Sequence, residues 1–126
     1  MVSNDDVIKV VQEAVRQFGH AVQKFQAKTL PAIVLSDAPP AIKIVIQEAS
    51  PKFSHETARK LARKATVCVE TWDGYVTIDG ERSDAILVNY WTQGRGPIFF
   101  VQRYRLNPFE WVGEAIAGEE TSVLQS

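Results

Sequence analysis

The sequence is poor in several features that would point directly to a class of protein. Its 126 residues include a single cysteine, Cys68, so no disulfide can form within the chain, and this suits a reducing compartment. No apolar run approaches the roughly 18 residues of a membrane span. The polar, acidic first residues also lack the pattern of a secretory signal. We therefore expect a cytoplasmic protein with no membrane partner.

The basic and acidic side chains nearly cancel in number, but they are unevenly distributed along the chain. The formal net charge is −1, which provides no overall attraction to nucleic acid or to an anionic membrane. Residues 51–66 carry five basic side chains and one acidic one, whereas residues 107–126 carry four acidic ones and no basic one. The length and the 45% of hydrophobic residues predict a single domain over residues 1–126, with a flexible tail at 119–126.

The central segment, residues 65–106, predicts an antiparallel meander. Asp73-Gly74 suits the positive φ values of a tight hairpin turn, and residues 79–82 and 93–96 hold further glycine-containing turn signals. Between these turns lie the four expected strands, Thr66–Trp72, Tyr75–Asp79, Ser83–Thr92 and Pro97–Leu106. The rest of the chain is expected to pack on or beside them.

Three segments predict helices around this meander. Residues 4–28 carry apolar side chains at spacings of three and four, which make one continuous stripe. Residues 54–65 predict a second, basic helix capped by Ser54. Asn107 followed by proline has the pattern of a helix start, and it predicts a short third helix near the C-terminus.

Residues 32–49 admit two interpretations. Ala32–Leu35 is a short apolar run that suits an edge strand. From Ile42 to Ile46, isoleucines occupy every second position, and this alternation favours a second strand. The alternative is a helix that begins at Asp37, with the following prolines in its first turn.

These elements predict an α+β domain. We expect a meander of four or five antiparallel strands, packed against the long N-terminal helix and two shorter helices on one face, as a two-layer sandwich. The alternative is a strongly curved, cone-like sheet wrapped around the long helix. A cavity between helix 4–28 and the inner face of the sheet would distinguish this second arrangement from the first.

The two longest strands raise the question of what covers the sheet. Strands 83–92 and 97–106 are apolar on both faces near their middle, whereas a meander with one wet face alternates more cleanly. A helix, a ligand or another chain must cover the second face, and a homodimer is one way to do so. For a protein partner or self-association, the candidate contact residues are Trp91, Phe99, Arg103 and Arg105.

Arg103 and Arg105 lie about 7 Å apart on one face of their strand. Two guanidinium groups at this spacing could hold a carboxylate or phosphate of a partner. They could equally form structural ion pairs with Glu70, with Asp84 or with the acidic end of the chain.

Two further sets of residues are candidate sites. Four basic side chains of the second helix could contact an anion, although a solvated helix face explains them equally, and we do not expect nucleic acid as the partner. These residues are Arg59, Lys60, Arg63 and Lys64. In the cone-like arrangement, the residues expected to line a pocket are His20, Tyr90, Gln102 and Tyr104.

The sequence contains no recognisable catalytic or metal-ligating constellation. His20, His55 and Cys68 lie on different segments without the spacing of metal ligands, and Cys68 alternates with valines as a buried hydrophobic residue does. We therefore expect no metal and no cofactor, and an enzyme is the less favoured interpretation. The leading hypothesis is a non-enzymatic interaction or regulatory module, such as an adaptor, inhibitor or immunity-like protein. The alternatives are a pocket protein or small enzyme of the cone-like fold, and a weak nucleic-acid binder through helix 54–65.

Overall fold

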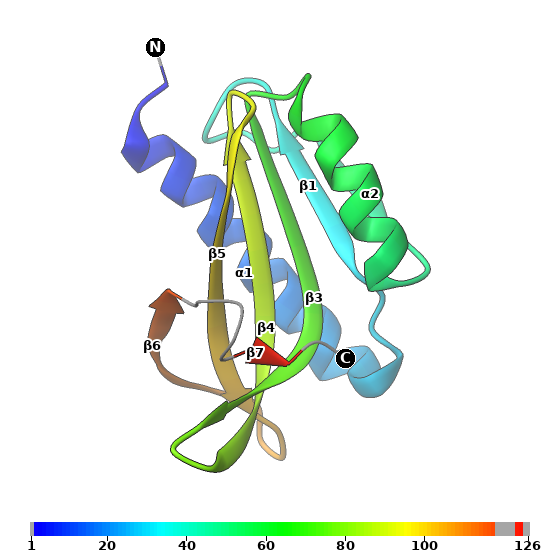
Figure 1. The fold of residues 1–126 in the computed structure, drawn as a ribbon, viewed down its shortest axis with the longest axis vertical. Coiled ribbons are helices and arrows are strands. Elements are labelled where there is room, and N and C mark those ends of the chain that lie inside the picture. Colours follow the sequence, from blue (N-terminus) through cyan, green and yellow to red (C-terminus); the bar gives the residue numbers. More distant parts are fainter. Residues whose placement is uncertain (1, 118–122, 125–126) are drawn as a thin grey trace.

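The computed structural model describes residues 2–117 and 123–124, which form one antiparallel sheet with two helices (Figure 1). The strands lie in the order β2-β1-β3-β4-β5-β6, and β7 pairs separately with β3. The helical elements are α1 (Asn4–Phe25), its 3₁₀ continuation η1 (Gln26–Lys28) and α2 (Pro51–Ala62). The strands are β1 (Ala32–Ser36), β2 (Ile44–Gln47), β3 (Val67–Ile78), β4 (Glu81–Thr92), β5 (Arg95–Arg105), β6 (Glu110–Ala117) and β7 (Val123–Leu124). The α+β class and the antiparallel sheet are confirmed.

Helix α1 corresponds to the helix predicted at residues 4–28. Ser3 caps it, because its side-chain oxygen accepts a hydrogen bond from the backbone N–H of Asp5 at 3.2 Å. The apolar stripe of α1 is buried against valine and isoleucine side chains of β1, β3 and β4, and the helix crosses behind the sheet in Figure 1. The buried residues of this stripe are Val7, Val10, Val11, Ala14, Phe18 and Val22.

The two helices lie on opposite faces of the sheet, so the prediction of a two-layer sandwich with all helices on one face is wrong. Helix α2 packs through Ala58 and Ala62 against side chains of β1, β3 and β4, including Cys68, that point away from α1. The physical reason lies in β3, whose successive residues from Val67 to Trp72 are all buried. A strand that is apolar on both faces needs a cover on each side.

The turn predicted at Asp73-Gly74 is also wrong, because β3 runs through it without a break. Gly74 lies opposite Ala85 in a ladder with β4 that covers the whole of β3. A turn at Gly74 would have exposed the neighbouring apolar side chains, whereas Trp72 and Val76 are buried. The next predicted turn is confirmed, because the chain turns at Asp79 and Gly80, whose φ values are +52° and +80°.

The strand interpretation of residues 32–49 is confirmed, with β1 and β2 paired antiparallel. However, β1 is not an edge strand, since β2 is outermost and β1 lies between it and β3. Helix α2 begins at Pro51, earlier than predicted, and Ser50 caps it by accepting a hydrogen bond from the N–H of Phe53. Ser54 is therefore not the cap, and its side chain is buried under the helix.

The third helix predicted to start at Asn107 is absent from the described residues, which form strand β6 there. Asn107 has a φ of +67° and belongs to a turn after which β6 pairs antiparallel with β5. Without β6, the outer backbone groups of β5 would remain unpaired, and this pairing outweighs the local helix signal. The flexible tail predicted at 119–126 lies mostly outside the described residues, but Val123–Leu124 form β7 against Tyr75 and Val76.

Neither α1 nor α2 combines the length and the apolar character that crossing a membrane requires, and these are the α-helices of the described residues.

Candidate functional site

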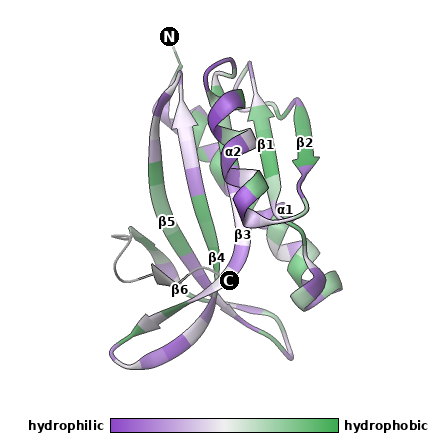
Figure 2. Cartoon of the chain, turned by 45° about the vertical axis from the view of Figure 1, so that its right-hand side comes forward, coloured by the Kyte–Doolittle hydropathy of each residue, from purple (hydrophilic) through white to green (hydrophobic). Residues whose placement is uncertain are grey.

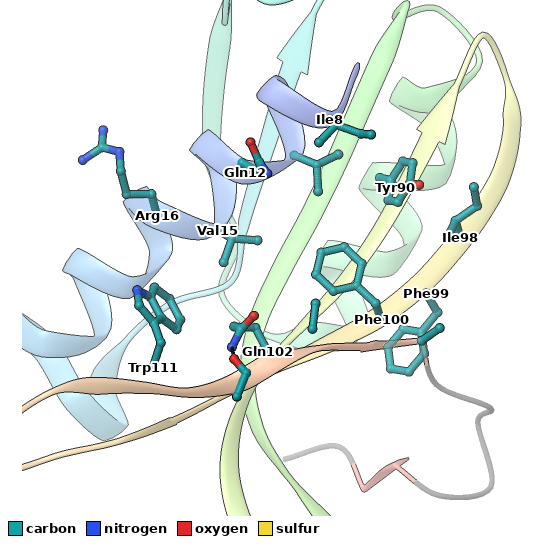
Figure 3. A pocket seen from close by; sticks show the side chains of 14 residues that line it. Ile8, Gln12, Val15, Arg16, Tyr90, Ile98, Phe99, Phe100, Gln102 and Trp111 are labelled. Atoms are coloured by element: carbon teal, nitrogen blue, oxygen red, sulfur yellow. Dashed lines mark hydrogen bonds between the residues drawn. The ribbon is translucent and has the colours of Figure 1, made fainter. Parts of the chain in front are cut away.

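A pocket of about 700 Å³ lies between α1, β4, β5 and β6 (Figure 3). This is the cavity between the long helix and the sheet that the cone-like alternative required. α1 packs closely on β3 and β4, whereas a space remains open between the helix and the outer strands β5 and β6. The pocket therefore lies where the helix no longer covers the sheet closely.

A bulge interrupts the pairing of β6 with β5 beside the pocket. Val101 pairs with Ile116 and Arg103 pairs with Val112, so three residues of β6 lie opposite Gln102 alone. The first of the three, Gly113, has a φ of +67°, a conformation that favours glycine. Bulges bend a strand and increase its twist, and this bend directs β6 toward α1.

Apolar and aromatic side chains dominate the pocket wall. Ile8, Val11 and Val15 project from α1, while the rings of Tyr90, Phe100 and Trp111 project from β4, β5 and β6. Figure 3 shows the labelled side chains arranged around one space, with Trp111 at the opposite end from Ile8 and Ile98.

Trp111 reaches the helix because Gly19 has no side chain. Two ring carbons of Trp111 lie 2.8 Å from the point where a Cβ of residue 19 would be. The ring also packs edge-on against Phe109, with centroids 4.9 Å apart. Gly19 weakens a helix by about 1 kcal/mol relative to alanine, but here it allows β6 to close one end of the pocket.

The polar groups of the pocket are few. Gln102 donates from its side-chain nitrogen to the carbonyl oxygens of Gly113 and Arg103, at 3.2 and 3.3 Å. At the rim, Nε of Arg16 donates to Glu13 Oε2 at 2.7 Å. This hydrogen bond lowers the pKa of the Glu13 carboxyl below its usual range.

Two of the four predicted pocket residues line this space, and two do not. Tyr90 and Gln102 line it. Tyr104 is instead buried beside it, where its hydroxyl donates to Asp73 Oδ1 at 2.5 Å. Burial raises the pKa of Tyr104, and it raises the pKa of Asp73 against the opposing effect of this hydrogen bond. His20 is exposed on α1.

The four predicted partner-contact residues do not form one exposed surface. Trp91 is buried beneath α2, and Phe99 is half-buried with its ring centroid 6.2 Å from that of Trp72. Arg105 Nε lies 3.2 Å from Glu110 Oε2, whereas Arg103 Nε is buried without a hydrogen-bond partner within residues 2–117 and 123–124. Arg105 therefore pairs with the acidic end of the chain, one of the three expected alternatives, whereas no ion pair joins either arginine to Glu70 or Asp84 in the described residues.

Two of the basic candidates, Arg59 and Lys60, lie in the last turn of α2, and the other two, Arg63 and Lys64, directly follow its last residue. Much of α2 is hydrophilic (Figure 2). All four are exposed, and in the described part of the chain none forms an ion pair. They are Arg59, Lys60, Arg63 and Lys64. A solvated helix face has this appearance, and none of the four lines the pocket between α1, β4, β5 and β6.

A buried polar cluster, which was not predicted from the sequence, lies beneath the first turns of α2. Glu70 is fully buried, and its carboxylate accepts hydrogen bonds from Ser54 Oγ at 2.7 Å and from Asn89 Nδ2 at 3.3 Å. His55 Nδ1 lies 2.5 Å from the same carboxylate, and the His55 ring packs edge-on against Trp72. The available signal was the glutamate itself, placed on β3 within a run of uncharged, mostly apolar residues.

Cys68 has the role of a buried hydrophobic residue. It is fully buried between β3 and α2, with Sγ 3.6 Å from the carbonyl oxygen of Ala58. Burial, together with the nearby charge of Glu70, raises the pKa of its thiol to about 12. The thiol is therefore protonated at neutral pH, which makes it a poor nucleophile.

Comparisons of this chain with protein-family models, with curated proteins and with solved structures found no match.

Proposed function

We propose that this protein binds a small apolar molecule in the pocket between α1, β5 and β6. The observation that carries the proposal is the cavity of about 700 Å³ with its aliphatic and aromatic wall. Ligand sites are typically concave, largely apolar and roughly 300–1,000 Å³ in volume, with a small number of polar groups that fix the ligand's orientation. The pocket has each of these properties.

The rim of the pocket supports the proposal, because it leaves large apolar side chains in contact with water. Ile8 is 47% exposed, Ile98 53% and Trp111 43%, and all three line the pocket. A bound apolar molecule would remove part of this surface from water. Each 100 Å² of apolar surface removed in this way is worth about 2.5 kcal/mol before the costs of association.

A pocket-filling substitution tests the proposal. We expect Val15→Trp to weaken binding of the uncharged dye N-phenyl-1-naphthylamine by about tenfold or more, because the indole would occupy the middle of the space between Phe100 and the helix. Binding is measured by the increase in dye fluorescence on titration. Val45→Trp is the matched control, since Val45 is exposed on the outermost strand β2 and does not line the pocket.

The comparison of the two variants decides the result. Full dye affinity in the control, together with lost affinity in a Val15→Trp protein that still unfolds cooperatively, supports the pocket. Equal dye affinity in both folded variants would remove it as the binding site.

An interaction module, the leading hypothesis from the sequence, is the second candidate. The observation in its favour is the outer strand β2, where Ile44 and Val45 are exposed apolar residues at an edge of the sheet (Figure 2). Unpaired strand edges can add a strand from another chain. Light scattering over a range of protein concentrations separates the candidates, because self-association through β2 raises the mass whereas a ligand held within one chain does not.

A further inference from the structure

We infer that the pocket selects a flat, uncharged aromatic ligand that carries a hydrogen-bond donor, such as a hydroxyl or an N–H group. This inference rests on the proposed function and adds the class of ligand. It depends on the fixed orientation of one amide, on the rings around it and on the pairing of the one charged side chain among the described residues of the wall.

The orientation of the Gln102 side chain follows from its two partners. The carbonyl oxygens of Gly113 and Arg103 can only accept hydrogen bonds, so the nitrogen of the amide must face both of them. The reverse orientation would place the amide oxygen against two other oxygens. The nitrogen is therefore committed to the protein, and the amide oxygen remains as an acceptor.

The bulge in β6 explains why this acceptor lies in the pocket. Because three residues of β6 oppose Gln102 alone, the carbonyl of Gly113 lies within reach of the amide. Figure 3 shows Gln102 extending from β5 toward α1, between Trp111 and Phe100. A donor on a ligand in this space would meet the amide oxygen.

The neighbouring rings favour a flat aromatic molecule. Tyr90 and Phe100 pack edge-on with centroids 6.3 Å apart, and Trp111 closes the other end of the space. Aromatic rings associate with one another through offset or edge-on contacts that add to the effect of their burial. Three rings around one acceptor suit an aromatic ligand better than a flexible chain.

The charges at the wall favour a neutral ligand. Arg16 is the one charged side chain among the described residues that line the pocket. It lies at the rim and is already paired with Glu13 on its own helix. The part of the wall that the structure describes therefore presents no uncompensated charge that would require an ionic ligand.

Two probes that differ in the donor test the inference. We expect 1-naphthol to bind about fivefold more tightly than 1-methoxynaphthalene, because only naphthol can donate to Gln102. A pocket without a facing acceptor would give the opposite order, since methoxynaphthalene has an additional methyl group to bury and no hydroxyl to desolvate. Isothermal titration calorimetry with the wild-type protein measures both affinities.

A pair of glutamine variants assigns the effect to one residue. Gln102→Leu removes the acceptor, so we expect the preference for naphthol to disappear or reverse. Gln12→Leu changes the other glutamine of the pocket, on α1, and should leave the fivefold preference unchanged. If Gln102→Leu does not fold, the order of the two probes in the wild type and in Gln102→Met decides.

The outcomes separate this inference from the proposed function. Binding of both probes with methoxynaphthalene preferred, or with the preference for naphthol retained in both Gln102 variants, overturns the inference and leaves the pocket intact. If neither probe binds the wild-type protein, the proposed function fails along with the inference.

Discussion

Replacing Glu70 by alanine is expected to lower the free energy of unfolding by about 3–5 kcal/mol, the range for removing one partner of a buried charged cluster. The carboxylate is fully buried and accepts hydrogen bonds from Ser54 and Asn89, with His55 also in contact. The Glu70→Ala substitution removes this acceptor. The donors of Ser54 and Asn89 then lack a partner that water cannot readily replace beneath α2. Urea denaturation at neutral pH measures the change.

Two control variants make this result specific to the buried cluster. Glu70→Gln keeps one acceptor oxygen in a side chain of the same shape, so it should lose less than half as much stability as Glu70→Ala. Glu81→Ala removes an exposed glutamate at the start of β4, and it should change stability by less than about 0.5 kcal/mol. A Glu70→Ala protein as stable as Glu81→Ala would show that the cluster contributes little to the fold.

Gly113→Ala is expected to lower the free energy of unfolding by about 2–3 kcal/mol and to weaken ligand binding. The φ of +67° costs a residue with a Cβ about 1–2 kcal/mol. The new methyl group would also lie 2.9 Å from Nη2 of Arg103, and the Nε of that arginine is buried in the sheet, so the side chain cannot move away freely. Urea denaturation and titration with 1-naphthol measure the two effects.

Gly80→Ala is the matched control for this substitution. Gly80 has a φ of +80°, but no atom lies within 4 Å of the position of its missing Cβ. It should therefore show the backbone penalty alone and keep the affinity for naphthol. Equal losses in the two variants, with binding unchanged in both, would contradict a role of the Gly113 bulge in shaping the pocket.

The elements with strong local signals could be predicted from the sequence. Helix α1 could be predicted because its apolar residues recur at spacings of three and four. The helix buries most of these same residues. Strand β2 was predicted because its isoleucines alternate. In both segments, the local preference and the tertiary packing favour the same structure.

The errors arose where packing between distant segments outweighs a local signal. Asp73-Gly74 has the composition of a turn, but the pairing of β3 with β4 on one side and the burial of Trp72 and Val76 keep it extended. The sequence from Asn107 onwards is typical of a helix start, but the residues that follow pair with the edge of β5 and form β6. No local pattern reports on a partner strand elsewhere in the chain.

The pocket could be predicted only in part, for the same reason. Tyr90 and Gln102 were chosen because their faces on β4 and β5 follow from alternation, and both line the pocket. Trp111 was missed because its segment was assigned to a helix, and Val15 was missed as a pocket residue because an apolar stripe does not show which part remains uncovered. The path of β6 beside the pocket depends on a bulge at Gly113. No local sequence pattern predicts that bulge.

The measurement that tests the central claim most directly is a titration of the wild-type protein with 1-naphthol, followed by methyl-resolved carbon–proton correlation spectra. The account predicts saturable shifts at methyl groups of Ile8, Val15 and Ile98, which surround the pocket, and no shifts at Ile44 or Val45 on β2. Shifts confined to β2, or no saturable shift at any pocket methyl, would contradict the claim that the space between α1 and the curved edge of the sheet is a ligand site.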